Sequence, residues 1–191
     1  MAARQTGFAM LAEGSVQEVM DLSAVAHLAS LKGSLPFLNF FDGFRTSHEL
    51  QKIEVLEYDE LENLLDKEAL QQFRNRAMTP NNPKTLGSNQ NPDIFFQQRE
   101  TVNRYYEEIP SIVQNYMQEI NQLRGTDYDL VNYYGAEDAT DVIVAMGSVT
   151  PVIEQVIDYL TTQGKKSRFA KYSLISSFPS RKLFNKNCRK Q

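Results

Sequence analysis

The chain has 191 residues, of which 41% are hydrophobic, and its formal net charge is −4. This apolar content is enough for a packed core and too high for a disordered protein. It contains no apolar run of the roughly 18 residues that cross a membrane, and its first residues lack the apolar stretch of a secretory signal. A single cysteine, Cys188, cannot form an internal disulfide, an iron–sulfur cluster or a structural zinc site. We therefore expect a protein of the reducing cytosol.

The charge is distributed unevenly along the chain. Residues 165–191 carry nine Lys or Arg and no acid. Residues 1–164 hold the other 11 basic residues and all 24 acidic ones, which gives a net charge of −13. An acidic body is thus followed by a basic tail.

The first predicted elements are a helix and a strand. Ser15 and Glu18 form the pattern of a capping box, in which each side chain accepts a hydrogen bond from the other residue's backbone N–H. Apolar residues then recur at helical spacing until Gly33. The dense apolar run at residues 35–41 predicts a buried parallel strand, so this region is half of an α/β unit.

The middle of the chain predicts two helical regions separated by a loop. The first begins at Asp59 and ends near Met78. Residues 79–93 contain three Pro and four Asn and predict a long loop, which is functional or packs across another domain. The second helical region covers residues 94–124, is divided at 109–110 by a proline, and is closed by Gly125.

Residues 141–164 predict a strand, a turn and a helix that open a second α/β domain. The helix begins near Thr150 with Pro151 in its first turn, where the missing N–H costs nothing. The turn at residues 146–150 places backbone N–H groups at a helix N-terminus, where phosphate can bind. A plain connection is the commoner use of such a turn, and both interpretations stay open.

The segment with the most side chains suited to catalysis is residues 42–49. It follows the first predicted strand, on the side where open α/β sheets bind ligands. An arginine there can bind a carboxylate or phosphate, and a histidine beside an acid can transfer a proton. The alternative is structural: a hydroxyl caps a helix, and the arginine pairs with the first aspartate. This loop is therefore a candidate ligand-facing or interface-facing site, and its candidate residues are Asp42, Arg45, Thr46, Ser47, His48 and Glu49.

Several stretches, in order between Arg4 and Lys166, are similar to the pyruvate:ferredoxin (or flavodoxin) oxidoreductase family. They read RQTGFA, GSVQEVMDL, PFL, FFDGFRTSHE, QKIE, QNPDI and VIVAMGS. The resemblance implies a large, usually dimeric, oxygen-sensitive cytoplasmic enzyme of anaerobic metabolism. Such an enzyme decarboxylates pyruvate on thiamine diphosphate with Mg²⁺, passes electrons through [4Fe–4S] clusters to ferredoxin or flavodoxin, and makes acetyl-CoA from coenzyme A.

The resemblance also implies the fold class and the domains. Residues 1–125 resemble the later part of a pyrimidine-binding-type domain of a thiamine diphosphate enzyme, a parallel sheet with helices. That part includes the loop 79–93 and the helices 94–124. Residues 126–166 resemble the first β–α unit of a domain like the C-terminal domain of transketolase.

The departures from the family limit what this chain is expected to do alone. The cluster cysteines are absent, and the family's activating acid and main pyruvate-binding residues lie before Met1 in the family order. The diphosphate and Mg²⁺ site belongs to a distant C-terminal domain. The resemblance therefore assigns no catalytic, cofactor-binding or metal-binding residue here, and it predicts an inactive fragment that binds no cofactor by itself.

Residues 167–191 are predicted to be an out-of-frame translation. The family resemblance implies a strand such as V-G-L-L-K-V after the last predicted helix, and a βαβ unit needs that strand. Residues 167–170, SRFA, do not fit a strand pattern. Codons AGT CGG TTT GCT encode SRFA, and the same bases read one position later encode V-G-L-L. A natural basic tail is the alternative.

Three functions stay open on the sequence: an inactive part of the oxidoreductase, a non-catalytic interaction module, and a binder of nucleic acid or membrane through the basic tail. The net charge of −13 in residues 1–164 opposes the third. The expected partners are the remainder of the oxidoreductase and its dimer mate, with ferredoxin or flavodoxin for the full enzyme; neither a membrane nor nucleic acid is expected. Exposed sheet edges predict an aggregating or partner-dependent protein.

Overall fold

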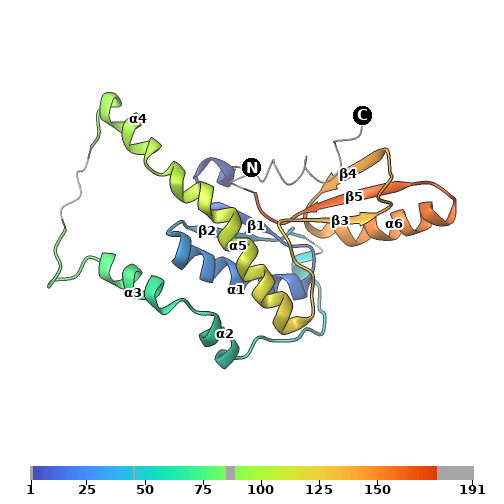
Figure 1. Cartoon of the computed structure of the whole chain (residues 1–191), viewed down its shortest axis with the longest axis horizontal. Coiled ribbons are helices and arrows are strands. Elements are labelled where there is room, and N and C mark those ends of the chain that lie inside the picture. The colour runs from blue at the N-terminus through green and yellow to red at the C-terminus, as the bar shows by residue number, and fades with distance from the viewer. Residues whose placement is uncertain (1, 45, 85–88, 176–191) are drawn as a thin grey trace.

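Two small β-sheets and the helices that cover them make up residues 2–44, 46–84 and 89–175, the part of the chain that the computed structural model describes (Figure 1). The first sheet pairs β1 (Ala9–Ala12) with β2 (Phe37–Phe40), and the second has the order β3 (Val131–Gly135), β5 (Ser167–Tyr172), β4 (Asp141–Ala145). The helices are α1 (Val16–Gly33), α2 (Tyr58–Leu64), α3 (Lys67–Arg76), α4 (Pro92–Glu100), α5 (Asn103–Arg124) and α6 (Thr150–Thr162). Short 3₁₀ turns lie at Ala2–Gln5 (η1), Thr46–His48 (η2) and Gly147–Val149 (η3). The α/β class predicted from the sequence is confirmed.

The first sheet is a parallel pair joined by α1. Ala9 lies opposite Phe37 and Ala12 opposite Phe40, so β1, α1 and β2 form a βαβ unit. The predicted parallel strand is thereby confirmed, although β2 is half-buried rather than buried. It is half-buried because, within the described residues, β2 has a neighbour on one side only.

Helix α1 begins with the predicted cap, with one change of partner. The Ser15 hydroxyl oxygen accepts a hydrogen bond from the Glu18 N–H at 3.2 Å. The Glu18 carboxylate accepts from the Gly14 N–H at 2.7 Å, and not from the Ser15 N–H as predicted. At the other end, Ser34 takes the left-handed conformation with φ of 54°.

Gly33 is needed at the end of α1 because α5 crosses there. A Cβ atom at this position would lie 2.4 Å from Cδ1 of Ile109. The two helices bury an extensive apolar contact, and α5 contributes Ile109, Val113, Tyr116, Met117 and Ile120 to it.

The predicted helix boundaries in the middle of the chain are partly wrong. The region from Asp59 to Met78 is two helices, because the Asp66 side chain accepts from the Ala69 N–H at 3.0 Å and starts α3. The later helical region is divided at Thr101, not at the proline. Pro110 lies inside α5. The cost of an interior proline, about 3 kcal/mol, is offset by the packing of α5 on α1.

The second sheet contains a strand that the sequence pattern did not predict. Residues 167–170 form most of β5, which pairs antiparallel with β3 and parallel with β4, so the statement that SRFA is no strand is wrong. Phe169 and Ala170 are fully buried. A central strand is specified by burial and by pairing on both sides, and these outweigh a weak local pattern.

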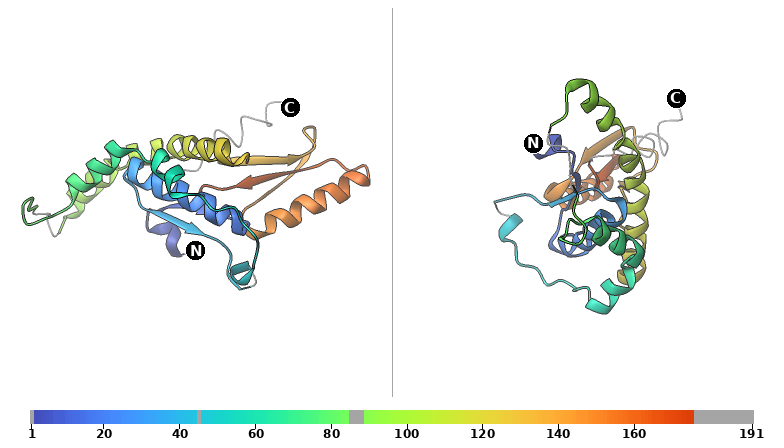
Figure 2. Two further views of the ribbon diagram at one scale, coloured as in Figure 1. Left: turned by 90° about the horizontal axis from the view of Figure 1, so that it is seen from below. Right: turned by 90° about the vertical axis from the view of Figure 1, so that its left-hand side faces the viewer.

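The two sheets share one hydrophobic core. It joins β1 and α1 to α5 and continues through Leu130, Ala170 and Leu174 into the second sheet. Residues 173–175 run beside β1: the Ala12 N–H donates to the Ser173 carbonyl at 2.9 Å, and the Ile175 N–H to the Met10 carbonyl at 2.8 Å. Figure 2 shows α3 and α4 extending away from both sheets on the side opposite α6.

Candidate functional site at the junction of the two sheets

The predicted loop supplies one residue that links the two halves of the structure. Asp42, just after β2, accepts hydrogen bonds from the Ser148 N–H at 2.8 Å and from the Ser148 hydroxyl at 2.6 Å. The hydroxyl hydrogen bond, and to a smaller extent the backbone one, hold the pKa of the Asp42 carboxyl below its usual value. Asp42 thus connects the end of the first sheet to the turn that precedes α6.

The other described candidates in this loop bond within the loop. The Ser47 hydroxyl donates to the Phe44 carbonyl at 2.8 Å, and His48 Nδ1 lies 2.8 Å from the same oxygen. The Glu49 carboxylate accepts from the Gln51 amide at 3.1 Å. Thr46 begins the 3₁₀ turn η2 and lines a small cavity. Arg45 lies outside the described residues, as does the predicted Arg45–Asp42 ion pair.

The loop and the residues that flank it expose apolar side chains as well as polar ones. Phe44 is 87% exposed, and the flanking Phe41 and Leu50 are 44% and 97% exposed. Beneath the loop is a cavity of about 110 Å³ formed with α1, lined by Ser15, Val16, Val19, Phe41, Thr46, Ser47 and Glu49. Exposed aromatic and aliphatic side chains over internally bonded polar groups are typical of an interface-facing segment.

The predicted phosphate-binding turn is closed by Asp42. Gly147 has φ of 79°, and a Cβ atom there would lie 2.8 Å from Asp42 Oδ2. The carboxylate sits where an external anion would meet the N–H groups of the turn. Among the two interpretations left open by the sequence, the structure favours the plain connection, with Asp42 as its internal anion.

The turns after β1 and before α6 touch each other directly. A Cβ atom on Gly14 would lie 2.6 Å from Thr150 Oγ1 and 2.8 Å from the Gly147 carbonyl oxygen. Thr150 is fully buried at this contact. Gly14 therefore allows a close approach of the two turns that a side chain at this position would prevent.

A buried ion pair ties β5 to α1 at the same place. Lys171 Nζ contacts Glu18 Oε1, and the two side chains are 16% and 12% exposed. The other carboxylate oxygen of Glu18 accepts the hydrogen bond from the Gly14 N–H. Sequence reasoning missed this pair because its members are 153 residues apart.

Glu13 is the most unusual group of the junction. Its side chain is fully buried after β1, and neither carboxyl oxygen has a hydrogen-bond partner among the described residues. Burial raises the pKa of Glu13 to about 8, which the nearby Asn39 amide opposes and the Glu18 carboxylate reinforces. Only the short apolar run before Glu13, which β1 occupies, could have indicated its burial from the sequence.

A second polar network holds α1 against the end of α5. The Asp21 carboxylate accepts from the Tyr128 hydroxyl at 2.9 Å and from the Gln17 amide at 3.1 Å. Burial, and then the bond to Asp21, raises the pKa of Tyr128. The Arg124 guanidinium lies 3.9 Å from Asp21, which compensates the charge of that buried carboxylate.

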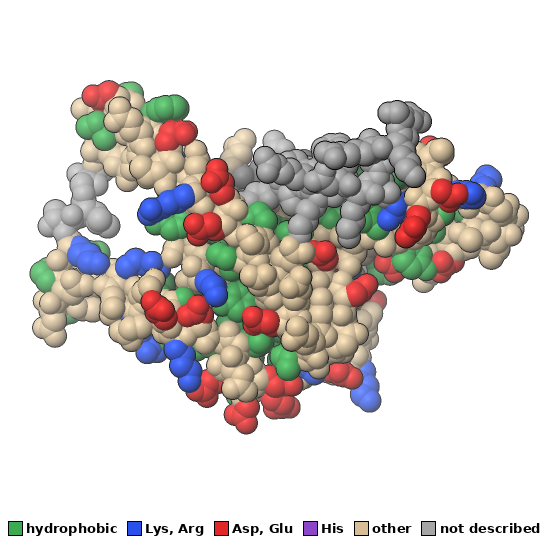
Figure 3. Space-filling model, viewed as in Figure 1, with side chains coloured by type: hydrophobic (Ala, Val, Ile, Leu, Met, Phe, Trp, Pro, Cys, Tyr) green, Lys and Arg blue, Asp and Glu red, His purple; other side chains and the backbone are tan. Residues whose placement is uncertain are grey.

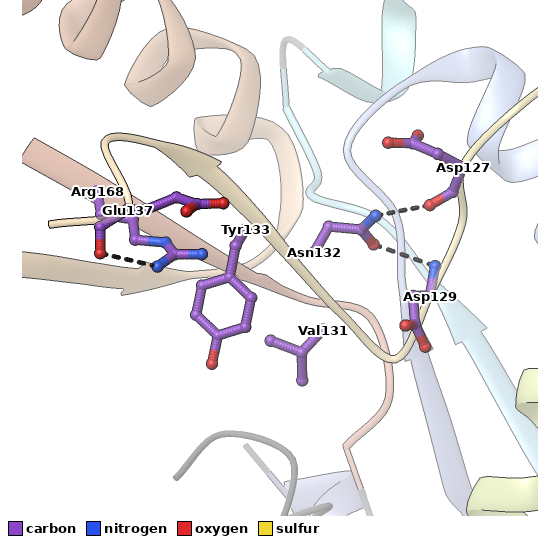
Figure 4. Close-up of a pocket in the computed structure, with 7 residues that line it drawn as sticks. All are labelled: Asp127, Asp129, Val131, Asn132, Tyr133, Glu137 and Arg168. Carbon is purple, nitrogen blue, oxygen red and sulfur yellow. Dashed lines mark hydrogen bonds between the residues drawn. The ribbon is translucent and has the colours of Figure 1, made fainter. Parts of the chain in front are cut away.

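A cavity of about 480 Å³ lies on the second sheet (Figure 4). The guanidinium of Arg168 covers the Tyr133 ring at 4.5 Å, and Asn132 bridges the Asp127 carbonyl at 2.6 Å and the Asp129 N–H at 3.1 Å. Its lining includes three carboxyl groups and one guanidinium, from Asp127, Asp129, Glu137 and Arg168. This excess of negative charge disfavours anions such as carboxylates and phosphates.

The described ranges, residues 2–44, 46–84 and 89–175, hold neither a cluster of metal-ligand side chains nor a helix suited to a membrane. No group of three or more His, Cys, Asp or Glu residues there could hold a metal ion. Within those ranges, too, each helix is shorter or more polar than a membrane crossing requires.

Comparison with known proteins agrees with this geometry. The sequence profile of the family described as "Pyruvate flavodoxin/ferredoxin oxidoreductase, thiamine diP-bdg" matches residues 1–118. A solved 2-oxoglutarate:ferredoxin oxidoreductase from Magnetococcus marinus, with 2-oxoglutarate, coenzyme A and succinyl-CoA bound, has a similar fold. Its TM-score is 0.53 at 15% sequence identity, over 93% of this chain and 32% of that one.

Curated relatives are much more similar to this chain in sequence than the solved structure is, and they are much longer than this chain. The pyruvate-flavodoxin oxidoreductase of Klebsiella pneumoniae is 57% identical over 93% of this chain, and the pyruvate:ferredoxin oxidoreductase of Moorella thermoacetica is 53% identical over 93%. The pyruvate dehydrogenase [NADP(+)] of Cryptosporidium parvum is 49% identical over 84%. The chain spans 15% of the length of the first two relatives and 8% of the third. It belongs to the pyruvate flavodoxin/ferredoxin oxidoreductase family.

Proposed function

We propose that this chain is one segment of a pyruvate:ferredoxin or pyruvate:flavodoxin oxidoreductase and is inactive until the rest of the enzyme is joined to it. The observation that carries the proposal is the match at 57% identity along nearly the whole chain to 15% of a pyruvate-flavodoxin oxidoreductase. In the whole enzyme the reaction is the oxidative decarboxylation of pyruvate to acetyl-CoA, with ferredoxin or flavodoxin as the electron acceptor.

Within that enzyme the segment contains the passage between two domains. Residues 1–125 belong to the later part of the thiamine diphosphate-binding domain, and residues 126–166 to the start of the next α/β domain. The Asp42–Ser148 contact crosses between these parts, and the Glu18–Lys171 contact joins the first part to β5, which follows the second. They support a role in fixing the orientation of the two domains.

Thiamine diphosphate, which the family implies, does not fit the described residues. In the turn before α6 the Ser148 N–H donates to Asp42, and the lining of the cavity on the second sheet carries more carboxyl groups than cations. The Glu13 carboxyl is fully enclosed by protein. We therefore derive no step of the reaction through the cofactor from this segment. In the proposed enzyme the cofactor, Mg²⁺ and the [4Fe–4S] clusters are held by other segments.

The alternative of an interaction module is favoured by one observation, the high exposure of the apolar side chains of Phe44 and Leu50 in and beside the loop. Both the enzyme segment and the interaction module would use these side chains in a contact with another protein surface. Binding of nucleic acid through the basic tail is less favoured, because acidic side chains line the lower margin of the face in Figure 3, over α2 and the segment before it. A steeply salt-dependent affinity for DNA or anionic vesicles would favour the tail instead.

A chimeric enzyme tests the proposal. Residues 1–166 of this chain replace the matching residues of the Klebsiella pneumoniae enzyme, and pyruvate-dependent reduction of flavodoxin is measured beside the parent enzyme and the isolated chain. The proposal predicts activity in the chimera and none in the isolated chain. It is contradicted if the isolated chain oxidises pyruvate, or if a chimera that folds and carries its clusters has no activity.

A further inference from the structure

Glu13, the residue after β1, is enclosed where three segments of the chain meet. Its N–H donates to the Phe40 carbonyl of β2 at 3.1 Å. The N–H of the preceding Ala12 donates to the carbonyl of Ser173, just after β5, at 2.9 Å. The following Gly14 lies so close to the turn before α6 that a Cβ atom on it would be 2.8 Å from a backbone oxygen of that turn. The backbone around Glu13 thus joins the first sheet to the segments around the second.

The burial of the Glu13 side chain makes its charged form unfavourable. The side chain is fully buried, and among the described residues neither carboxyl oxygen has a hydrogen-bond partner. An enclosed carboxylate loses the strong hydration that it has in water, whereas a neutral carboxyl loses much less. Burial therefore raises the pKa of Glu13 to about 8, and the closed structure holds this carboxyl in its protonated form at neutral pH.

The groups around Glu13 leave the balance in favour of the protonated form. The Asn39 amide of β2 lowers the pKa of Glu13, and the Glu18 carboxylate of α1 raises it. Lys171 of β5 contacts Glu18 Oε1, so its charge compensates that acid. The turn before α6 has no charged residue, and the carboxylate that it binds, Asp42, is also negative.

We propose that the Glu13 carboxyl controls the junction of the two sheets, which is closed while this carboxyl is neutral and opens when it loses its proton to solvent. An ionised Glu13 needs water around it, and water reaches it only when a covering segment moves away. The turn before α6 and residues 173–175 move, because a few hydrogen bonds hold them to the first sheet. Strand β2 stays in place, since it pairs with β1 along the whole length of both strands.

The balance between the closed and the open junction then depends on pH. The pKa of Glu13 is about 8 in the closed form and returns toward the usual 4.5 once water surrounds the carboxyl. Between these two values the closed form binds more protons than the open form does. The opening constant therefore rises about tenfold with each pH unit in this range and levels off above it.

Amide hydrogen exchange on the whole chain, followed by mass spectrometry at several values from about pH 5 to about pH 8, tests the proposal. Residues 9–14 and 147–153 report on the junction, and residues 113–120 of α5 report on unfolding of the core. Each rate is corrected for the intrinsic exchange rate at that pH. The junction amides are expected to exchange faster than those of α5, and their opening constant is expected to rise about tenfold per pH unit.

Two variants show whether Glu13 is the source of this rise. Glu13→Gln keeps the shape of the side chain and has no proton to lose, so its junction amides are expected to exchange at rates that do not depend on pH after correction. Glu107→Gln, which alters an exposed glutamate on α5, is the matched control and is expected to keep the rise.

Carbon-13 NMR of the glutamate carboxyls checks the same group in the unaltered chain. One glutamate is expected to titrate near pH 8, well above the others. The proposal is overturned if none does, if the junction amides exchange no faster than those of α5, if their opening constant does not change with pH, or if the rise persists in Glu13→Gln. No step of the test uses pyruvate, so its outcome is independent of the proposed function.

Discussion

The carboxylate of Asp42 accepts two hydrogen bonds from Ser148, a residue 106 positions later in the chain. This contact closes the turn before α6 and links the two sheets. The loop that looks catalytic in the sequence is therefore part of the junction between the two sheets. The energetic value of this contact is therefore a direct measure of how the two halves hold together.

A double-mutant cycle on Asp42→Ala and Ser148→Ala should give a coupling of about 1 kcal/mol, because Ser148→Ala removes the hydroxyl that donates to the ionised Asp42 carboxylate and keeps the backbone N–H that donates to it. Urea unfolding measures it. Since the pKa of Asp42 is lowered in the folded state, the contribution is present at neutral pH and is lost as the pH falls through that lowered pKa. Independent effects of the two substitutions would show that the bond from the Ser148 hydroxyl does not stabilise the junction.

Glu13 should make the protein less stable in alkaline solution. Its folded pKa of about 8 lies above the usual 4.5, so the folded state binds the extra proton between these values. The contribution of Glu13 to the free energy of unfolding is greatest below about pH 4.5. It falls by an amount on the order of 3–5 kcal/mol as the pH rises to about 8.

The variant Glu13→Gln should remove most of that slope when unfolding is measured from pH 5 to pH 9. Glu107→Gln, which alters an exposed glutamate on α5, should leave it unchanged. An unchanged slope in Glu13→Gln would mean that the buried carboxyl is not the source.

Gly33→Ala should destabilise the chain by about 1–3 kcal/mol, because the new methyl group meets Ile109 Cδ1 in the contact between α1 and α5. Adding Ile109→Val removes that carbon and should recover part of the loss. Gly43→Ala is the control, since a Cβ there has open space around it. Equal effects of the two glycine variants in urea unfolding would contradict a tight crossing at Gly33.

The isolated chain should neither release CO₂ from pyruvate nor carry iron–sulfur clusters, because one cysteine cannot supply the four thiolates of a [4Fe–4S] cluster. Reconstitution with iron and sulfide, followed by absorption spectroscopy and an assay of CO₂ release, checks both points. A brown protein after reconstitution would refute the cluster prediction.

The sequence predicted the elements whose local signals are strong. The capping pattern at Ser15 and the proline after Thr150 lead to α1 and α6. Strand β1 was missed because four residues of apolar sequence carry no periodicity. The local pattern does not predict β5, because a central strand depends on partners elsewhere in the chain. Pro110 does not divide α5, because the packing of this helix on α1 also depends on a distant partner.

The loop after β2 was identified from the sequence, and its use was not. Hydroxyl, imidazole and carboxyl groups within a few residues are compatible with catalysis and with local capping alike. Only the hydrogen bond from Ser148 distinguishes Asp42 from the other polar residues of the loop. A local sequence pattern cannot predict this bond, because Ser148 is far away in the chain. Glu13 and Lys171 were missed because burial and long-range ion pairs leave no local pattern.

The out-of-frame origin of residues 167–191 stays a prediction, although β5 removes one reason for it. The matches to relatives, over 93% of a chain of 191 residues, also extend past Lys166. Lys171 occupies the position of the lysine in the expected V-G-L-L-K-V strand and forms the ion pair with Glu18. A lysine at position 171 is expected both if the reading frame is shifted and if β5 is a natural strand of the protein.

Sequencing the gene on both sides of this reading frame tests most directly whether the chain is a segment of a longer oxidoreductase. The account predicts that the DNA upstream encodes the earlier part of the thiamine diphosphate-binding domain. It also predicts that the DNA downstream, read one base later from codon 167, encodes V-G-L-L and then the family's cluster cysteines. Flanking DNA that encodes no such sequence in any frame would contradict the account.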